Sequence, residues 1–248
     1  MKITKINTYM FGFFLFTIVN SPVHGEEVWG AWFPAPSPDG KKISFSYYGD
    51  IWIVDADGEK AERLTVSEGY ESRSLWSPDG QWIAFQTDRW GNDDICVMRA
   101  NGTEPPERLT YYSTYDALYN WTPDGKSVVF VSPRTTLRPA LYRVSIDGGL
   151  PQPVTRFTAW HVCYTPDGKT LFYERGNTPW WRRKYRGGAN EEIWVKTLPD
   201  GKSEKITDHP GRDGYPMYSA IDKKLYFLSD RGEPSVSNIW RMDIDGKN

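Results

Sequence analysis

Cysteine and histidine are scarce in this chain, and neither sign of charge is in excess. The 248 residues include 2 Cys and 3 His, and the formal net charge is −2 at pH 7. Two cysteines do not form a disulfide framework, and so few histidines exclude a His-rich metal site. A charge this close to balance gives no sign of binding to nucleic acid or to an anionic membrane. We therefore expect no cofactor, no metal site and no nucleic-acid partner.

Motifs of several enzyme classes are missing as well. No Gly-x-Ser-x-Gly segment marks an α/β-hydrolase nucleophile, and no glycine-rich phosphate or dinucleotide loop occurs. His161 and His209 lack metal-ligand spacing, so we interpret them as structural or surface histidines. The Asp55-x-Asp57 segment resembles a calcium loop only faintly, because the required glycine and glutamate offsets are absent. No catalytic residue is predicted in this chain.

The N-terminus carries the only long apolar run. Lys2 and Lys5 precede apolar residues 10–19, and small residues follow before Glu26. This order is typical of a secretory signal peptide, residues 1–25. A membrane anchor is the alternative, but the run is shorter than the ~20 residues that a span needs. We expect a periplasmic or secreted chain with no stable membrane insertion once the signal peptide is removed.

The rest of the chain repeats one unit, seen most clearly from Trp76 to Thr110. The unit contains a Pro-Asp-Gly turn, an apolar strand, a third strand, an Asn-Gly or Asp-Gly hairpin turn and a final Leu-Thr pair. Successive turns are about 40–45 residues apart, which is the period of a four-stranded propeller blade. The copies of the first turn are Pro38–Gly40, Pro78–Gly80, Pro123–Gly125, Pro166–Gly168 and a degenerate Ala220–Asp222.

These repeats predict an all-β fold, a β-propeller of four-stranded antiparallel blades. Five blades are encoded in residues 26–248, at about 31–72, 73–115, 116–158, 159–212 and 213–248. The last hairpin turn, Asp245-Gly246, is not followed by its strand, so we expect a C-terminally truncated member of a six-bladed ring. We expect Cys96 and Cys163 to be buried free thiols, and four second-strand aromatics to be buried: Phe45, Phe85, Phe130 and Phe227.

An insertion interrupts blade 4 between its second and third strands. Its candidate contact residues for a peptide or a partner are Trp180, Trp181, Arg182, Arg183, Lys184, Tyr185 and Arg186. Arginine binds carboxylates bidentately and stacks on aromatic rings, so one interpretation is capture of a peptide's C-terminal carboxylate. The favoured alternative is an extended hairpin whose aromatic side chains pack on a neighbouring domain. We interpret two further pairs, Asp88-Arg89 and Asp230-Arg231, as groups that fix loops.

At this point the chain resembles a known family. The Pro-Asp-Gly units with third strands such as Asp50-Ile51-Trp52 resemble TolB and, more closely, the N-terminal propeller of tricorn-like proteases. The segment Thr87–Ile95 and the insertion with Pro179-Trp180 and Arg182–Lys184 carry the closer resemblance. That family implies a six-bladed first propeller, followed by a second propeller, a PDZ-like domain and a catalytic region with a serine nucleophile. It also implies that the propeller guides peptides while hydrolysis occurs elsewhere.

Two functional hypotheses follow. The first is a non-catalytic N-terminal propeller of an exported tricorn-like serine protease, which admits or guides peptide substrates in proteolysis. Its partners would be peptide substrates or other domains of the same protease. The second is a TolB-like periplasmic propeller that binds a protein partner. A variant of the first is the propeller of a prolyl-oligopeptidase-type hydrolase. The oligomeric state does not follow from the sequence.

Overall fold

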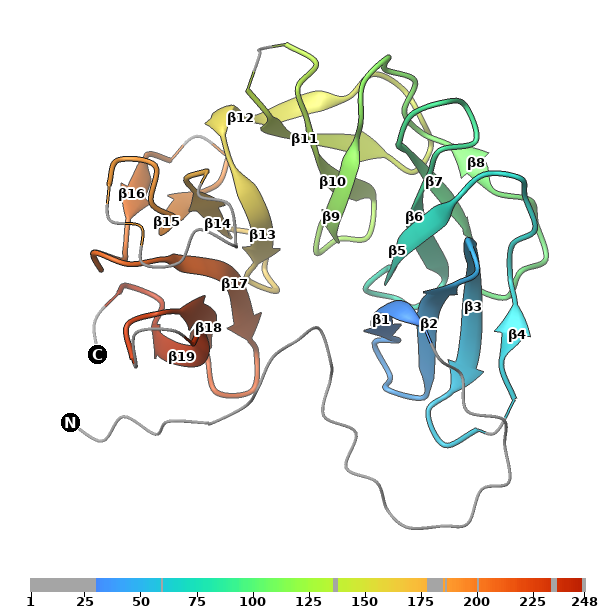
Figure 1. Cartoon of the computed structure of the whole chain (residues 1–248), viewed down its shortest axis with the longest axis horizontal. Helices are drawn as coiled ribbons and strands as arrows, with labels where there is room; N and C mark the ends of the chain where they lie inside the picture. The colour runs from blue at the N-terminus through green and yellow to red at the C-terminus, as the bar shows by residue number, and fades with distance from the viewer. Residues whose placement is uncertain are drawn as a thin grey trace. The chain divides into compact units, whose positions relative to one another are not determined.

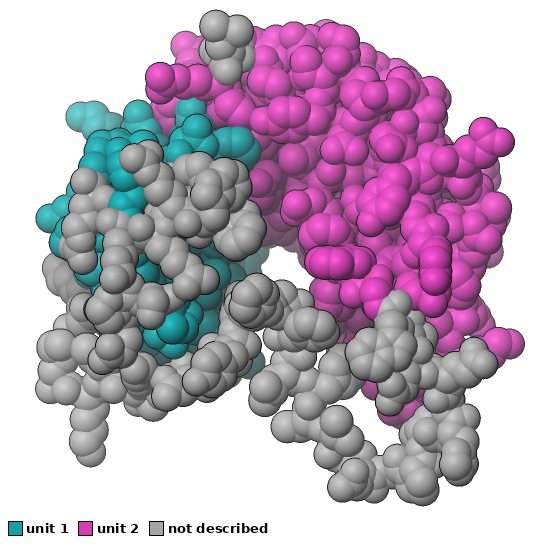
Figure 2. Space-filling view, viewed as in Figure 1, with its two compact units in different colours: residues 1–18, 158–248 teal, residues 19–157 magenta. Residues whose placement is uncertain are grey.

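The computed structural model describes residues 30–58, 60–135, 138–177, 185, 187–199, 201–232 and 236–246. Within these residues all regular structure is β-strand, in five separate antiparallel sheets (Figure 1). An all-β fold of five propeller blades is therefore confirmed, whereas the sixth blade stays a prediction. The chain divides into two compact units, residues 19–157 (unit 2) and residues 1–18 with 158–248 (unit 1), coloured separately in Figure 2.

Unit 2 contains three four-stranded sheets, each formed by strands consecutive in sequence. The first strands of these sheets adjoin one another, β1 against β5 and β5 against β9 (Figure 1). The strands are β1 (Trp32–Pro36), β2 (Lys42–Tyr47), β3 (Asp50–Asp55), β4 (Glu62–Arg63), β5 (Glu71–Trp76), β6 (Trp82–Thr87), β7 (Asp94–Arg99), β8 (Glu107–Arg108), β9 (Ala117–Trp121), β10 (Ser127–Ser132), β11 (Ala140–Ser145) and β12 (Gln152–Thr158).

Unit 1 contains two sheets, and their first strands again lie against each other. One sheet has four strands, and the other has three within the described residues. The strands are β13 (Trp160–Tyr164), β14 (Thr170–Arg175), β15 (Glu192–Thr197), β16 (Ser203–Lys205), β17 (Asp213–Ser219), β18 (Lys224–Ser229) and β19 (Asn238–Asp243).

The Pro-Asp-Gly segments join first and second strands, as predicted. In the second sheet, the Ser77 hydroxyl donates to Asp79 Oδ1 at 2.5 Å, and the Gln81 N–H donates to the same oxygen at 3.0 Å. These hydrogen bonds lower the pKa of Asp79 because they favour its charged form. Gly80 closes the turn at φ 70°, which glycine adopts without strain. Hydroxyl-to-Asp bonds recur at Ser37–Asp39, Thr122–Asp124 and Thr165–Asp167.

The Leu-Thr pairs have an equally definite role. The Thr110 hydroxyl oxygen accepts the backbone N–H of Ile95 at 2.9 Å, beside the short strand β8. Both groups are buried, so this side-chain contact satisfies a donor that would otherwise be costly. The same bond is repeated from Ile51 to Thr65, Leu141 to Thr155 and Ile193 to Thr207. The repeat therefore encodes a hydrogen bond in each four-stranded sheet.

The core of each unit lies between neighbouring sheets and is formed mainly by second and third strands. In unit 2, Phe85 packs with Ile51 and Ile83, which come from two different sheets. In unit 1, Phe172 packs with Leu225 and Phe227 in the same way. The predicted burial of the second-strand aromatics is confirmed at Phe45 (8% exposed), Phe85 (0%), Phe130 (0%) and Phe227 (1%).

The two ends of each sheet differ in what they carry. Strand direction places the Pro-Asp-Gly turns and the third-to-fourth-strand hairpins at one end, called here the Pro-Asp-Gly end. The opposite end carries the second-to-third-strand hairpins and the connections to the next sheet, and is called the connector end. The blade-4 insertion joins β14 to β15, so it belongs to the connector end of its sheet.

Four first strands contain a β-bulge whose central residue is neither glycine nor in the usual region of φ. Positive φ values occur at Phe33 (52°), Arg73 (55°), His161 (37°) and Tyr215 (53°), within the irregular registers of β1, β5, β13 and β17. Such conformations cost about 1–3 kcal/mol each and are concentrated at functional sites. The first strands are therefore candidate positions for a functional site.

Candidate functional site

The predicted contact residues of the insertion fall mostly outside the described residues. Trp180, Trp181, Arg182, Arg183, Lys184 and Arg186 are among those whose placement the structure does not describe. Tyr185 is described and half-buried, and its hydroxyl lies over Gly187, where a Cβ would collide with it. The peptide-contact hypothesis for these seven residues therefore stays a prediction.

The two ends of the insertion are held together. The Asn177 N–H donates to the Ala189 carbonyl at 3.0 Å, and the Asn190 N–H donates to the Gly187 carbonyl at 2.9 Å. The Trp160 indole N–H donates to the Gly176 carbonyl at 3.0 Å. These bonds extend the β14–β15 hairpin beyond the sheet and fix the points where the insertion leaves and returns.

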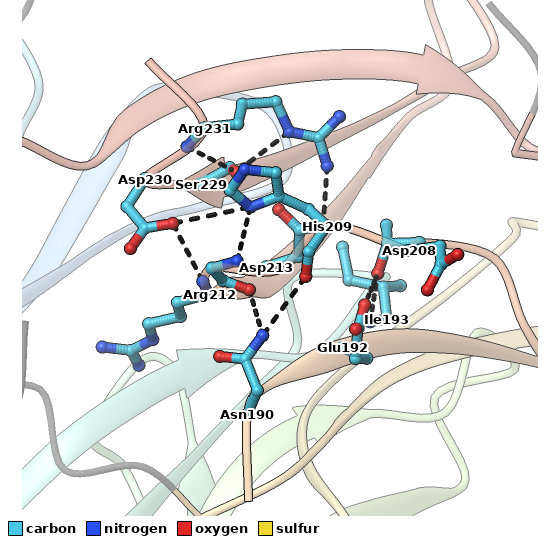
Figure 3. Close-up of polar contacts among 12 residues, drawn as sticks. Asn190, Glu192, Ile193, Asp208, His209, Arg212, Asp213, Ser229, Asp230 and Arg231 are labelled. Carbon is cyan, nitrogen blue, oxygen red and sulfur yellow. Dashed lines mark hydrogen bonds and ion pairs between the residues drawn. The ribbon is translucent and has the colours of Figure 1, made fainter. Parts of the chain in front are cut away.

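A polar network links the residues at the two ends of the insertion to the connection that leads into β17 (Figure 3). The Asn190 side-chain amide donates to the backbone carbonyls of His209 and Gly211. The Gly211 N–H donates to His209 Nδ1 at 3.0 Å, and the Arg212 N–H donates to Asp230 Oδ1 at 2.9 Å. The connector end of unit 1 is therefore a network of specific hydrogen bonds, to which the insertion is anchored.

The arginine of each Asp-Arg pair reaches back to a buried acid. Arg231 donates to Asp213 Oδ2 at 2.7 Å, and Arg89 forms an ion pair with Glu71. Arg134 donates to both oxygens of Asp116 at 2.8 Å, although no aspartate precedes it. In all three cases acid and arginine are 18 residues apart. The interpretation of Arg89 and Arg231 as loop-fixing groups is confirmed.

The most unusual arrangement in unit 1 is called here the His161 cluster: His161 on β13, Glu174 on β14, Tyr215 on β17, and Arg212 just before β17. His161 Nδ1 is 3.0 Å from Glu174 Oε2, and the same oxygen accepts the Tyr215 N–H at 3.0 Å. The His161 and Tyr215 rings stack with centroids 3.7 Å apart. Arg212, whose guanidinium is 5.5 Å from the Tyr215 ring centroid, also forms an ion pair with Glu191.

Burial and charge give the His161 cluster its chemistry. Glu174 is only 1% exposed, and a Cβ at Gly214 would collide with its carboxylate. Burial, and secondarily the Glu174 charge, raises the pKa of Tyr215, so its phenol stays protonated near neutral pH. Tyr215 is 39% exposed. The cluster therefore offers solvent an aromatic ring backed by imidazole, carboxylate and guanidinium groups, which suits binding.

A histidine, an aspartate and a serine come together in unit 1 without forming a catalytic triad. His209 Nδ1 is 3.6 Å from Asp230 Oδ1, but this nitrogen accepts the Gly211 N–H, so it cannot donate to the carboxylate as a triad requires. Ser229 Oγ accepts the backbone N–H and Nε–H of Arg231. These hydrogen bonds fix the connection in place, and the geometry supports no nucleophile.

Within the described residues, no group of three His, Cys, Asp or Glu side chains could hold a metal ion. No helix among them is long and apolar enough to cross a membrane. Both cysteines are free: Cys96 is buried and Cys163 half-buried. Burial raises the pKa of each thiol to about 12, so neither carries the thiolate needed for nucleophilic chemistry.

The His161 cluster was not predicted from the sequence, since His161 was interpreted only as structural or surface. Its partners Glu174, Arg212 and Tyr215 stand 13, 51 and 54 positions further along the chain, and no local motif marks them. The 18-residue spacing between acid and arginine was available in the sequence. This spacing would have added Arg134 to the predicted loop-fixing arginines and identified their acid partners Glu71, Asp116 and Asp213.

Comparison with known proteins identifies the family and the fold of this chain. The family described as the tricorn protease N-terminal beta propeller domain matches residues 31–248. "Tricorn protease homolog 1" of Streptomyces coelicolor is 28% identical over 201 residues, which are 79% of this chain but 18% of that protein. The chain thus spans about a fifth of the length of that relative.

Two solved structures share the fold. The crystal structure of the tricorn protease superimposes with a TM-score of 0.72 at 24% identity, over 88% of this chain and 22% of that chain. A putative TolB from Agrobacterium tumefaciens superimposes with a TM-score of 0.71 at 23% identity, over 87% and 77%. At these identities the likeness concerns the fold alone. Because the family match extends from the first blade through the last described strand, this chain belongs to the tricorn protease N-terminal β-propeller domain family.

Proposed function

We propose that this chain is the non-catalytic propeller of an exported tricorn-like serine protease, where it binds peptide substrates and guides them toward a catalytic region elsewhere. The family match over residues 31–248 carries the proposal. The signal-peptide pattern of residues 1–25 supports export to the periplasm or beyond the cell. Peptides, and other domains of the same protease, are the proposed partners.

The first strands support a binding role. Strained bulges present Phe33 with Arg73 in unit 2, where the guanidinium lies 4.6 Å from the ring centroid. In unit 1 they present His161 with Tyr215, stacked at 3.7 Å. Each pair combines an aromatic face with hydrogen-bonding or charged groups, the combination by which proteins hold peptide side chains. The strain is retained at matching places of several blades, which argues for a shared role.

Peptide binding by the exported chain tests the proposal. Residues 1–248 would be expressed with export, the product purified, and fluorescein-labelled unstructured peptides titrated while polarisation is followed. We expect saturable binding without cleavage, weakened about tenfold by Tyr215→Ala, which removes an aromatic contact. His161→Ala, which removes the ring stacked on Tyr215, should weaken binding as well.

The alternatives predict different results. A TolB-like propeller would bind a folded protein and leave unstructured peptides free in solution. Retention of the product in the cytoplasm would contradict export. Either result would overturn the proposal, and hydrolysis that copurifies with the chain would overturn its non-catalytic part.

A further inference from the structure

Exposed apolar side chains in unit 2 gather at one end. Among its described residues, all but one of the exposed large hydrophobic side chains lie at the connector end, while Leu150 lies at the Pro-Asp-Gly end. A cleft of about 550 Å³ at that opposite end is lined by polar groups such as Asp39, Lys42 and Arg99. The exposed large hydrophobic side chains at the connector end are Trp32, Phe33, Tyr48, Val66, Tyr70, Trp90, Tyr111, Tyr112 and Tyr115.

Seven of these side chains come from hairpins and connections, and together they are called here the aromatic face: Tyr48, Val66, Tyr70, Trp90, Tyr111, Tyr112 and Tyr115. Contacts between their loops join these side chains into one surface. Gly49 lies against the Tyr70 ring, and the Tyr70 backbone N–H donates to Asp88 Oδ1 at 2.6 Å. The Asn92 amide donates to the Tyr112 carbonyl at 3.0 Å.

The centre of the aromatic face is held rigidly. The Arg108 guanidinium lies 4.2 Å from the Trp90 ring centroid and 4.5 Å from that of Tyr111. Arg108 is itself fixed by Asp94, which is 0% exposed, at 2.7 Å. Rigid Tyr and Trp side chains lose little conformational freedom on binding, which is why they dominate binding surfaces.

The exposed area is that of a macromolecular contact. Exposed fractions range from 36% for Tyr112 to 86% for Tyr48. With ~200 Å² for each aromatic side chain, the face exposes roughly 700 Å². A standard protein contact uses about 800 Å² on each partner, so the occupant is larger than a small molecule. An extended peptide of about ten residues, ~33 Å long, has the required reach.

Among the loops that carry the aromatic face the unpaired charges are acidic, although two exposed arginines at the same end, Arg73 on β5 and Arg156 on β12, lie outside these loops. Four arginines next to the face form ion pairs with buried acids: Arg63 with Asp50, Arg89 with Glu71, Arg108 with Asp94 and Arg134 with Asp116. By contrast, Glu68 and Asp88 are exposed and form no ion pair within the described residues. Aromatic faces beside free carboxylates attract Lys and Arg side chains through cation–π and ionic contacts.

We propose that the aromatic face binds an extended peptide that carries Lys or Arg between apolar residues. The hydroxyls of Tyr48, Tyr70 and Tyr115 have no partner among the described residues and are available to main-chain carbonyls. Carbonyls of an unfolded segment accept such bonds, whereas those of a folded partner are already satisfied. This inference rests on the proposed peptide binding and names where one substrate class is captured.

Three labelled decapeptides test it against the exported chain: Lys alternating with Leu, the same peptide with Glu for Lys, and the same with Ser for Lys. Binding is followed by fluorescence polarisation. We expect the Lys peptide to bind about tenfold more tightly than the Glu peptide. The double variant Trp90→Ser/Tyr111→Ser should weaken it about tenfold, and Glu68→Gln/Asp88→Asn should remove the preference for Lys. Leu150→Ser is the matched control at the opposite end and should stay within twofold.

The outcomes separate this inference from the function on which it rests. If no peptide binds at all, the proposed function fails. If peptides bind but neither double variant changes their affinity, only this inference fails. Equal affinity for the three peptides also overturns it, as does light scattering that shows dimers lost in Trp90→Ser/Tyr111→Ser. Tyr48→Ser/Tyr70→Ser gives a second test if the first variant melts early.

Discussion

Two opposing effects act on the pKa of the Asp94 carboxyl group. Asp94 is fully buried, and burial raises the pKa of its carboxyl group to about 6, although the Arg108 guanidinium acts in the opposite direction. A carboxyl group whose folded pKa exceeds its unfolded pKa holds its proton more tightly in the folded state. The stabilisation is therefore complete below the unfolded value of 3.8 and is lost as the pH rises through about 6.

The pH dependence of unfolding tests this residue. Between pH 7.5 and pH 5 we expect the Asp94 group to add about 1 kcal/mol to the free energy of unfolding. Asp94→Asn cannot titrate, so its stability should rise by that much less over the same interval. Urea unfolding of both proteins at the two pH values provides the comparison. An identical rise in both would show that other groups, such as the half-buried Glu192 carboxyl whose pKa is also raised, account for the effect.

A second prediction at the scale of one residue concerns the contribution of the Thr110 hydroxyl to stability. Its hydroxyl is the acceptor for the buried Ile95 N–H, so Thr110→Val keeps the shape and removes the acceptor. An unsatisfied buried donor costs about 1–3 kcal/mol. We expect a loss of that size in urea unfolding. Thr103→Val, at an exposed position in the preceding turn between β7 and β8, should be nearly neutral. Equal losses in the two variants would contradict this role of Thr110.

At the scale of the element, an acid near the start of a first strand pairs with an arginine after the second strand in three of the five sheets that the structure describes and holds the connector end together there. Asp116 is 0% exposed and is contacted by Arg134 through both oxygens. Removing one partner of a buried pair costs about 3–5 kcal/mol, whereas replacing both by apolar groups is often neutral. We expect Arg134→Met to destabilise by this amount and Arg134→Met/Asp116→Leu to recover most of it. Thermal unfolding of the unmutated protein and both variants measures this. If the double variant is no more stable than Arg134→Met, Asp116 contributes chiefly through other contacts.

Elements were also the scale at which the sequence was most informative. The turn at Pro78–Gly80 and the strand around Phe85 follow from local chemistry: fixed φ at proline, positive φ at glycine, and a short apolar run that is buried from Ile83 to Phe85. The bulges at His161 and Tyr215 could not be predicted, because neither residue favours a positive φ and only tertiary contacts hold them there. Glu174 gave no sign of its burial, because Gly214 and Tyr215, which cover its carboxylate, lie on a different sheet about 40 residues further along the chain.

At the scale of the whole molecule, the question is whether the chain performs chemistry by itself. The described residues place Ser229, His209 and Asp230 in one network, the residue types of a serine hydrolase (Figure 3). Their hydrogen bonds contradict that role, because His209 Nδ1 accepts the Gly211 N–H and Ser229 Oγ accepts from Arg231. The thiols of Cys96 and Cys163 are protonated, with pKa values raised to about 12.

We therefore expect the purified chain to cleave no peptide, while binding the peptides of the proposed function. The measurement is the release of fluorophore from quenched peptides over many hours, beside polarisation of the uncleaved forms. Ser229→Ala should leave binding unchanged, since its hydroxyl only accepts bonds from Arg231. Hydrolysis that persists through purification and disappears in Ser229→Ala would show that the network rearranges into a triad. Hydrolysis that persists in Ser229→Ala and follows the chain would place a nucleophile elsewhere in it, and either result would remove the division between a binding propeller and a distant catalytic region.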